Sequence, residues 1–255
     1  MSRLKVSAVP VLSDNYVWLI TNPDTGETAA VDPSVTEPVL EAVATEGLRL
    51  TQILNTHWHP DHTGGNQGIK AATGAPITAP AEAQKVSSVD RIVSEGDRVT
   101  VTGAEAIVWD IPAHTAGHVA YYFEDEGMIF VGDTMFAMGC GRLFECTPAQ
   151  MWSSLQKIVR WPDRTRLYCA HEYTQANGRF ALTVEPGNRA LVARMQEVAR
   201  ARAAGLPTIP TTLALEKATN PFLRAASRDL QATVGLSGAS EVEVFAKTRA
   251  LKDAF

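Results

Sequence analysis

Three histidines and an aspartate stand within six residues of one another, and this cluster constrains the chain more than any other feature. The stretch reads THWHPDHTGG over residues 56–65 and follows the apolar pair Ile53-Leu54 after one residue. An apolar run of this kind predicts a strand, and the loops at strand ends carry functional groups more often than the elements they connect. The sequence therefore predicts an exposed or metal-bound group of polar side chains at the exit of a strand.

The spacing within the cluster predicts where its side chains point. His57 and His59 lie two residues apart, so both face the same side of an extended segment, and the proline after His59 keeps that residue extended. Asp61 and His62 follow and point elsewhere as the chain approaches a bend that we expect Gly64-Gly65 to permit. We therefore expect two pairs of ligands to diverge from one short loop.

The remaining three histidines also follow a pattern. His114 and His118 belong to the segment HTAGH, His171 ends the apolar run 167–170, and Asp133 follows the apolar run 129–131 in the same way. Since a lone histidine is more often structural than a ligand, we interpret His118 as a structural residue. The other positions place histidine and aspartate repeatedly at the ends of predicted strands.

Neutral imidazoles and carboxylates are ligands that suit zinc, iron or manganese. Five histidines and two aspartates are too many for one tetrahedral ion, but they suit two ions that share a bridging carboxylate and a water. A metal lowers the pKa of its bound water to about 7, which supplies hydroxide at neutral pH. Hydrolysis is therefore the reaction class that this set favours.

Short β-type runs with helical patterns between them predict an α/β layered domain over residues 1–173. Helical spacing of apolar residues predicts helices over 37–45 and 148–161, the second with the capping residue Thr147 and Gln150 three positions later. The predicted strands are 16–21, 28–31, 51–55, 99–101, 106–110, 119–123, 128–131 and 167–170, and the turn 125–127 joins two of them.

After His171 the pattern becomes helical, with amphipathic stripes over 188–204 and 241–252, so we expect a small α-helical domain at residues 174–255. This part holds 11 Lys and Arg against 7 Asp and Glu, whereas residues 1–173 hold 12 against 21. The basic balance is either chance variation on solvated faces or a means of attracting an anionic small molecule.

Composition excludes several classes of protein. The 45% hydrophobic and 20% charged residues are typical of a globular chain, and no apolar run approaches the roughly 20 residues of a membrane helix. The basic residues form no dense blocks, which argues against nucleic acid as a partner. Three cysteines give no disulfide framework, so we expect reduced thiols. We also expect a cytoplasmic protein without membrane association, and separately a monomeric state.

These residues resemble the metallo-β-lactamase superfamily, whose signature is H-x-H-x-D-H, and within it the hydroxyacylglutathione hydrolase (glyoxalase II) family. The resemblance covers nearly the whole chain. The segments that carry it are 13–16, 56–65, 114–118, 132–134, 139–142, 171–173, 220–222 and 249–253. It implies an αββα sandwich followed by a helical domain that completes a glutathione site.

The resemblance also implies roles for individual residues. One metal would be held by His57, His59 and His114, the second by Asp61, His62 and His171, and Asp133 would bridge both. Asp61 and Asp133 would be the catalytic residues. The two divalent ions would be zinc, with iron or manganese as alternatives. The matching positions for glutathione are Arg142, Phe144, Tyr173, Arg249 and Lys252.

Two of these positions depart from the family pattern, which often has lysine in place of Arg142 and tyrosine in place of Phe144. The phenylalanine lacks a hydroxyl, and the arginine keeps the cation with a different geometry. Each substrate position also has a simpler interpretation as packing or as a solvated face. Cys140, between two glycines, we interpret as structural and not as a nucleophile.

The function that the resemblance implies is hydrolysis of S-D-lactoylglutathione to D-lactate and glutathione, the second step of methylglyoxal detoxification. The alternative is another enzyme of the superfamily, a lactonase or a persulfide dioxygenase that uses one iron. A transfer-RNA-processing nuclease would be expected to carry an RNA-binding arm, which we do not find in the sequence. A catalytically silent metal-binding or glutathione-binding module is the remaining alternative.

Overall fold

The computed structural model describes residues 4–255, which divide into two compact units. The first unit comprises the chain up to residue 111 together with residues 115–132. The second unit comprises residues 112–114 and 133–255. The division therefore separates two groups of the predicted ligands, and each unit is described by itself below.

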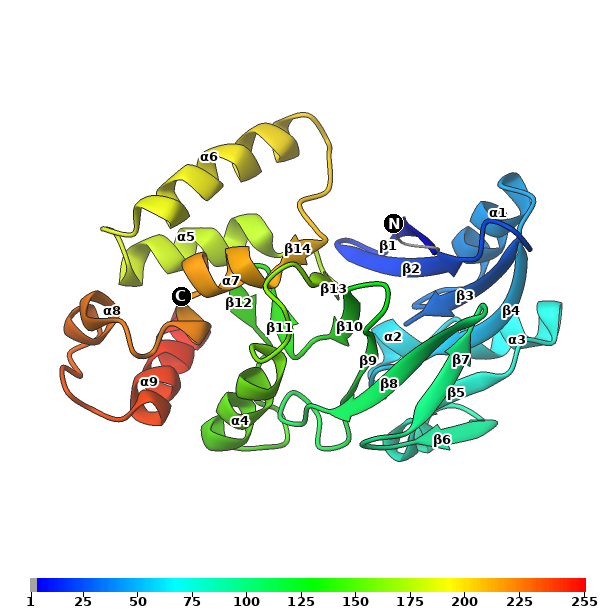
Figure 1. Cartoon of the computed structure of the whole chain (residues 1–255), viewed down its shortest axis with the longest axis horizontal. Coiled ribbons are helices and arrows are strands. Elements are labelled where there is room, and N and C mark those ends of the chain that lie inside the picture. The colour runs from blue at the N-terminus through cyan, green and yellow to red at the C-terminus, as the bar shows by residue number, and fades with distance from the viewer. Residues whose placement is uncertain (1–3) are drawn as a thin grey trace. The chain divides into compact units, whose positions relative to one another are not determined.

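The first unit holds ten strands in two sheets and three α-helices (Figure 1). The strands are β1 (Lys5–Val11), β2 (Asn15–Thr21), β3 (Glu27–Val31), β4 (Arg49–Leu54), β5 (Ile77–Pro80), β6 (Arg91–Val93), β7 (Arg98–Val101), β8 (Ala104–Asp110), β9 (Val119–Phe123) and β10 (Met128–Gly132). The helices are α1 (Glu37–Thr45), α2 (Pro60–Thr63) and α3 (Asn66–Thr73), with the 3₁₀ turn η1 (Ala81–Lys85).

The first sheet has the order β1-β2-β3-β4-β5-β6, antiparallel from β1 to β3 and parallel from β3 to β6. Every residue of β2 is buried, so both faces of this sheet are covered. On one face Val17 and Leu19 pack with Val39 and Val43 of α1 and with Ile69 of α3. Helices therefore cover this face.

The second sheet contains the antiparallel meander β7-β8-β9-β10 and lies on the other face of the first sheet. Tyr121 of β9 shows this directly, because its hydroxyl donates to the carbonyl oxygens of Asn55 at 2.9 Å and Thr78 at 3.3 Å. β9 and β10 are buried throughout. The first unit is thus a layer of helices followed by two packed sheets.

The second unit is mainly helical (Figure 1). Its strands are β11 (Met135–Phe136), β12 (Gly139–Cys140), β13 (Arg166–Cys169) and β14 (Thr211–Thr212). Its helices are α4 (Pro148–Ile158), α5 (Thr174–Val184), α6 (Arg189–Ala203), α7 (Leu213–Thr219), α8 (Arg228–Thr233) and α9 (Glu241–Ala254), with the 3₁₀ turn η2 (Pro221–Leu223). Among residues 4–255, no helix is long and apolar enough to cross a membrane.

Aromatic side chains form the core of the second unit. Phe222 packs between Phe180 of α5 and Phe245 of α9, with ring centroids at 6.1 and 5.9 Å, and Trp152 of α4 reaches Phe245 at 5.7 Å. Fully buried rings of this size contribute on the order of 3 kcal/mol each to stability. This core fixes the helices that surround the β11–β12 hairpin.

The structure confirms the predicted helix over 37–45 and the capping of α4, where Thr147 and Gln150 form a reciprocal capping box. The sequence missed β1, β5 and β6 in the first unit. It also missed α3 and α5, whose interiors contain glycine. The boundary at residue 173 stays a prediction, because the compact units divide at residue 133.

The turn between β9 and β10 gives a first prediction. Gly127 has φ +59° and open space around its Cα, whereas Gly187 has open space without a left-handed backbone. Gly127→Ala should therefore lower the free energy of unfolding by about 1 kcal/mol, and Gly187→Ala should change it by less than about 0.5 kcal/mol. Chemical denaturation measures both, and equal midpoints for the two variants would contradict the assigned turn.

Candidate active site

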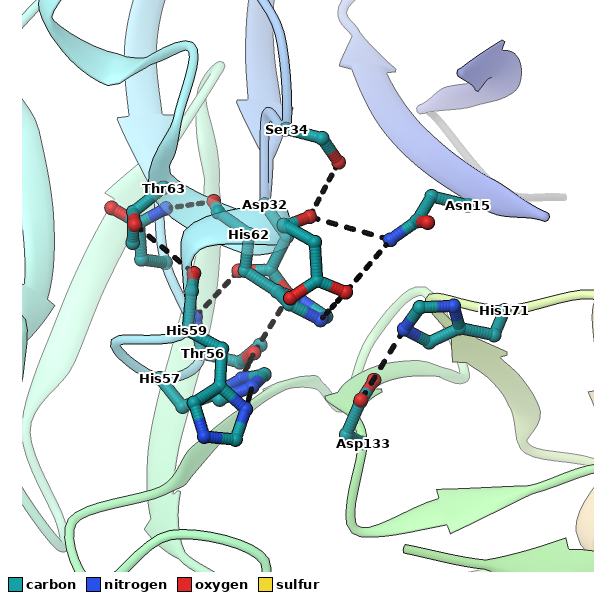
Figure 2. A network of polar contacts seen from close by, with 12 residues as sticks. Asn15, Asp32, Ser34, Thr56, His57, His59, His62, Thr63, Asp133 and His171 are labelled. Carbon is teal, nitrogen blue, oxygen red and sulfur yellow. Dashed lines mark hydrogen bonds and ion pairs between the residues drawn. The ribbon is translucent and has the colours of Figure 1, made fainter. Parts of the chain in front are cut away.

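The ends of two parallel strands bring the first group of polar side chains together (Figure 2). β3 ends before Asp32 and β4 ends before Asn55, and the carboxyl ends of parallel strands meet at one edge of a sheet. The single turn of α2 follows and carries Asp61 and His62. The sheet itself therefore places Asp32 beside the histidine cluster.

The cluster forms two pairs, as the spacing predicts. Nε2 of His57 lies 3.2 Å from Nδ1 of His59, and the two ring centroids are 4.7 Å apart. Nε2 of His62 lies 3.6 Å from a carboxylate oxygen of Asp61. His59 has φ −58° and ψ 146°, which is the extended conformation expected before proline. Nitrogen and oxygen donors at such separations match the chemistry of a metal ligand set.

Asp32 determines which nitrogen of two histidines carries the proton (Figure 2). One carboxylate oxygen accepts from the backbone N–H of Thr56 at 2.7 Å. The other accepts from the Thr56 hydroxyl at 2.7 Å and lies 3.1 Å from Nδ1 of His62. Because a carboxylate only accepts, the proton of His62 is on Nδ1, and Nε2 faces Asp61.

The same network orients His57. The Thr56 hydroxyl gives its proton to Asp32, so its oxygen accepts from Nδ1 of His57 at 3.1 Å. Nε2 of His57 is then the nitrogen with the lone pair, and it is the one directed at His59. Hydrogen bonds of this kind fix the tautomer and the ring orientation of metal-binding histidines.

Sequence reasoning missed Asp32, although it follows the predicted strand 28–31 much as Asp133 follows the apolar run 129–131. Its carboxylate, His57 and His62 offer ligand atoms within 4.8 Å of one another. We assign it an orienting role, because both of its oxygens are already engaged by Thr56 and His62. Its φ of +52° is a strained conformation for a non-glycine residue, which the three hydrogen bonds maintain.

Asp61 is held by Ser34 of the loop after β3 and by Asn15, the first residue of β2. Its carbonyl oxygen accepts from the hydroxyl of Ser34 at 2.5 Å, and the amide of Asn15 donates to its carbonyl at 3.3 Å and to its carboxylate at 3.2 Å. The Asp61 side chain remains 39% exposed. Its carboxylate is therefore fixed in direction and still accessible.

The chain turns at Gly64-Gly65 as expected, but not because glycine provides a left-handed backbone there. Both have negative φ, −60° and −82°, in the helical region. They are needed for close approach, since a Cβ would lie 2.5 Å from the Ser34 carbonyl oxygen at Gly64 and 2.6 Å from that of Val35 at Gly65. The glycines thus let α2 lie against the loop after β3.

The second unit brings together the other three predicted ligands. A carboxylate oxygen of Asp133 lies 3.5 Å from Nε2 of His114 and 3.3 Å from Nε2 of His171. Nδ1 of His114 lies 3.0 Å from the Arg142 carbonyl, which can only accept, so the proton is on Nδ1. Here too Nε2 of His114 is the nitrogen directed at a neighbouring predicted ligand, Asp133.

His118 lies in the first unit, fully buried, with its ring stacked on that of His57 at 4.6 Å and 17°. Its Nδ1 is 3.1 Å from the backbone carbonyl of Val119. This packing agrees with a structural residue that supports the ring of His57, a predicted ligand.

Three of the five predicted substrate residues gather in the second unit around Asp253. Arg249 donates to it at 2.9 Å and Arg142 lies 3.6 Å from it. Burial, followed by the charges of Arg249, Arg179 and Arg142, lowers the pKa of Lys252. This concentration of cations suits an anion. Sequence reasoning missed Arg179, an exposed residue of α5.

The predicted contacts differ in exposure. Arg249 is only 5% exposed, and its guanidinium also donates to the Cys140 carbonyl at 2.8 Å. Phe144 is 61% exposed, with its ring 5.2 Å from His114, and Tyr173 is 36% exposed and stacks on His171 at 4.6 Å. Two exposed aromatic rings therefore lie beside two of the predicted ligands.

The structure offers no activation of Cys140. The thiol is buried, and this burial raises its pKa to about 11, although Arg249 opposes the shift. A thiol with this pKa is protonated at neutral pH and is a poor nucleophile. The interpretation of Cys140 as structural agrees with this environment.

Two family models match the chain. Residues 12–171 match the metallo-β-lactamase superfamily, and residues 172–255 match the C-terminus of hydroxyacylglutathione hydrolase. Together they span the ligand positions of both units and the helical segment. The two matched ranges meet between residues 171 and 172, two residues before the domain boundary that the sequence predicts.

Curated relatives are similar over their full length. The hydroxyacylglutathione hydrolase of Rhodospirillum rubrum is 52% identical over 256 residues and covers 100% of both chains. That of Methylococcus capsulatus is 50% identical over 253 residues, 99% of each chain.

Solved structures share the fold at lower identity. ETHE1 from Myxococcus xanthus has a TM-score of 0.68 at 24% identity, covering 97% of this chain and 89% of its own. TTHA1623 in a di-iron-bound form has a TM-score of 0.63 at 24% identity, covering 86% and 100%. With the family models, these similarities confirm the predicted metallo-β-lactamase fold with a C-terminal helical domain. This fold and the His and Asp clusters together support divalent metal binding.

Removing the charge of Asp32 tests its orienting role. In Asp32→Asn one acceptor becomes a donor, so Thr56 and His62 cannot both be satisfied, and metal affinity should fall about 10- to 100-fold. Titration of the metal-free protein with zinc against a chromophoric chelator measures this.

Asp90→Asn is the matched control, because Asp90 accepts from the backbone N–H of Ile77 at 2.8 Å and pairs with Lys70, none of which is a predicted ligand. Its metal affinity should equal that of the wild type. Equal affinities for the two variants would refute the role of Asp32.

Proposed function

Because the chain belongs to the hydroxyacylglutathione hydrolase family of the metallo-β-lactamase superfamily, we propose that it hydrolyses S-D-lactoylglutathione to D-lactate and glutathione. The observation that carries the proposal is the shared orientation of ligand side chains. Hydrogen bonds hold the proton of His57, His62 and His114 on Nδ1 and direct Nε2 at a neighbouring ligand.

We propose that two divalent ions are the resident cofactors, zinc in the first place and iron or manganese as alternatives. His57, His59 and His114 would hold one ion, and Asp61, His62 and His171 the other, with Asp133 between them. The donor set fits such ions, because it offers only imidazole nitrogens and carboxylate oxygens with fixed tautomers. When bound, the two ions supply a nucleophile at neutral pH and polarise the thioester carbonyl.

The chain's own residues hold this arrangement in place. Asn15 and Ser34 fix the direction of Asp61, which would orient the nucleophile. Little acid catalysis is needed for the leaving group, because a thiol with a pKa of about 8.5 departs readily as a thiolate. This agrees with a site in which neither Asp61 nor Asp133 has to donate a proton to sulfur.

The cations of the second unit would recognise glutathione, whose two carboxylates make the thioester an anion. Lys252 and Arg142 would bind a carboxylate directly. We propose that Arg249 contributes its charge and fixes Asp253, although the sequence predicts direct contact. Tyr173 and Phe144 would line the site with their rings. A cytoplasmic location and a monomeric state stay predictions from the sequence.

Loss of the ultraviolet absorbance of the thioester bond tests the proposed reaction. With a metal-replete sample, S-D-lactoylglutathione should be consumed much faster than the matching acyl-coenzyme A thioester at the same concentration. No loss of absorbance would overturn the hydrolase assignment and favour a lactonase or dioxygenase activity.

Lys252→Ala tests substrate recognition. The loss of one charged contact should raise KM about tenfold at low salt with little change in kcat. Added salt should reduce the difference in KM between the variant and the wild type. Lys247→Ala, which removes an exposed lysine of the same helix, is the control and should leave KM unchanged. An unchanged KM for Lys252→Ala would exclude the proposed contact.

A further inference from the structure

The β11–β12 hairpin of the second unit is linked to all three predicted ligands of that unit, to two of them through the residues that flank it. Asp133 lies two residues before β11, and the Arg142 carbonyl that orients His114 lies two residues after β12. The ring of Phe136 in β11 meets the edge of His171 at 5.8 Å. A displacement of this hairpin would therefore move each of these ligands.

The two ends of the hairpin are closely packed. The backbone N–H of Gly141 donates to the Thr134 carbonyl at 3.2 Å. A Cβ at Gly141 would lie 2.1 Å from the Asp133 carbonyl oxygen and 3.0 Å from Nδ1 of His114. Because there is so little space around Gly141, a movement of the hairpin would also displace Asp133 and His114.

The turn of the hairpin is held by side chains and not by its own strands alone. Met138 has φ +54°, an unfavourable conformation for a non-glycine residue, and its backbone N–H donates to Glu216 at 2.8 Å. The amide of Asn220 donates to the carbonyl oxygens of Phe136 at 3.2 Å and Gly139 at 3.0 Å. The amide of Asn177 donates to the Ala137 carbonyl at 3.1 Å.

Glu216 is fully buried, and its charge is compensated within the same unit. The guanidinium of Arg194, which is 4% exposed, lies 2.5 Å from one carboxylate oxygen, and the Thr211 hydroxyl donates to the same oxygen at 2.7 Å. The other carboxylate oxygen accepts from Met138. A buried ion pair adds little net stability by itself, but it can specify one arrangement of the chain around it.

We propose that Glu216, with its partner Arg194, is a positioning residue for the metal centre. The pair joins α6 and α7 to the β11–β12 turn and fixes the hairpin that orients His114, Asp133 and His171. The helical segment therefore organises the ligands as well as binding substrate. The inference rests on the proposed function only in taking these three residues as metal ligands.

Glu216→Gln tests the proposal, because the amide cannot accept from Met138 and satisfy Arg194 at the same time. The metal affinity of the metal-free protein, measured with zinc against a chromophoric chelator, should fall about tenfold. In the zinc-loaded enzyme kcat should fall while KM for the thioester stays close to that of the wild type. The affinity measurement needs no substrate, so it stands even if the proposed hydrolysis fails.

Glu185→Gln is the matched control for lost stability. Glu185 is also a buried carboxylate of the second unit, and it accepts from Arg224 at 2.8 Å and Ser227 at 3.0 Å, none of which touches the hairpin. We expect it to lose stability and to keep wild-type metal affinity. Wild-type affinity in Glu216→Gln, or an equal loss in Glu185→Gln, would overturn the proposal.

If Glu216→Gln does not fold, Asn177→Ala replaces it. This variant removes one hydrogen bond from the same turn without disturbing the buried ion pair. A loss of metal affinity smaller than the tenfold expected for Glu216→Gln, with a thermal unfolding midpoint close to that of the wild type, would support the role of the hairpin. Wild-type affinity in this variant would overturn it.

Discussion

The candidate site depends on the hydrogen bonds that Nδ1 of His57, His62 and His114 donates. A neutral imidazole has a lone pair for a metal on only one of its two ring nitrogens. The hydrogen-bond partner of the other nitrogen decides which of the two this is. Asp32, Thr56 and the Arg142 carbonyl provide that partner for His62, His57 and His114. Without these acceptors the rings could rotate or exchange tautomers, and the clusters would not present a defined set of donors.

Each unit supplies its acceptors by a different route. In the first unit the edge of a parallel sheet places Asp32 beside the cluster, since β3 and β4 end there together. In the second unit a short hairpin supplies the Arg142 carbonyl, and helices hold this hairpin through Glu216 and Asn220. Under the proposal for Glu216, the helical segment therefore positions predicted ligands even though none of them belongs to its helices.

The sequence predicts the pairs His57–His59 and Asp61–His62 because the members of each pair are close along the chain. At such short separations the periodicity of a strand and the position of a proline decide where the side chains point. It does not reveal Asp32, whose partners Thr56 and His62 lie 24 and 30 residues away. Sequence reasoning missed the strand β1 for a different reason. It contains Pro10, and a proline in a sequence argues against a strand, although an edge strand such as β1 tolerates one. The burial of Arg249 also depends on contacts 109 residues apart.

The number of metal ions bound per chain tests the central claim most directly. Elemental analysis of the purified protein, after removal of loosely bound metal, should give two divalent ions per chain for the wild type. His62→Ala should retain fewer, because it removes one of the paired donors that Asp32 orients. A wild-type stoichiometry of one, or of none after loading with zinc, iron or manganese, would contradict a dinuclear centre and with it the proposed hydrolysis.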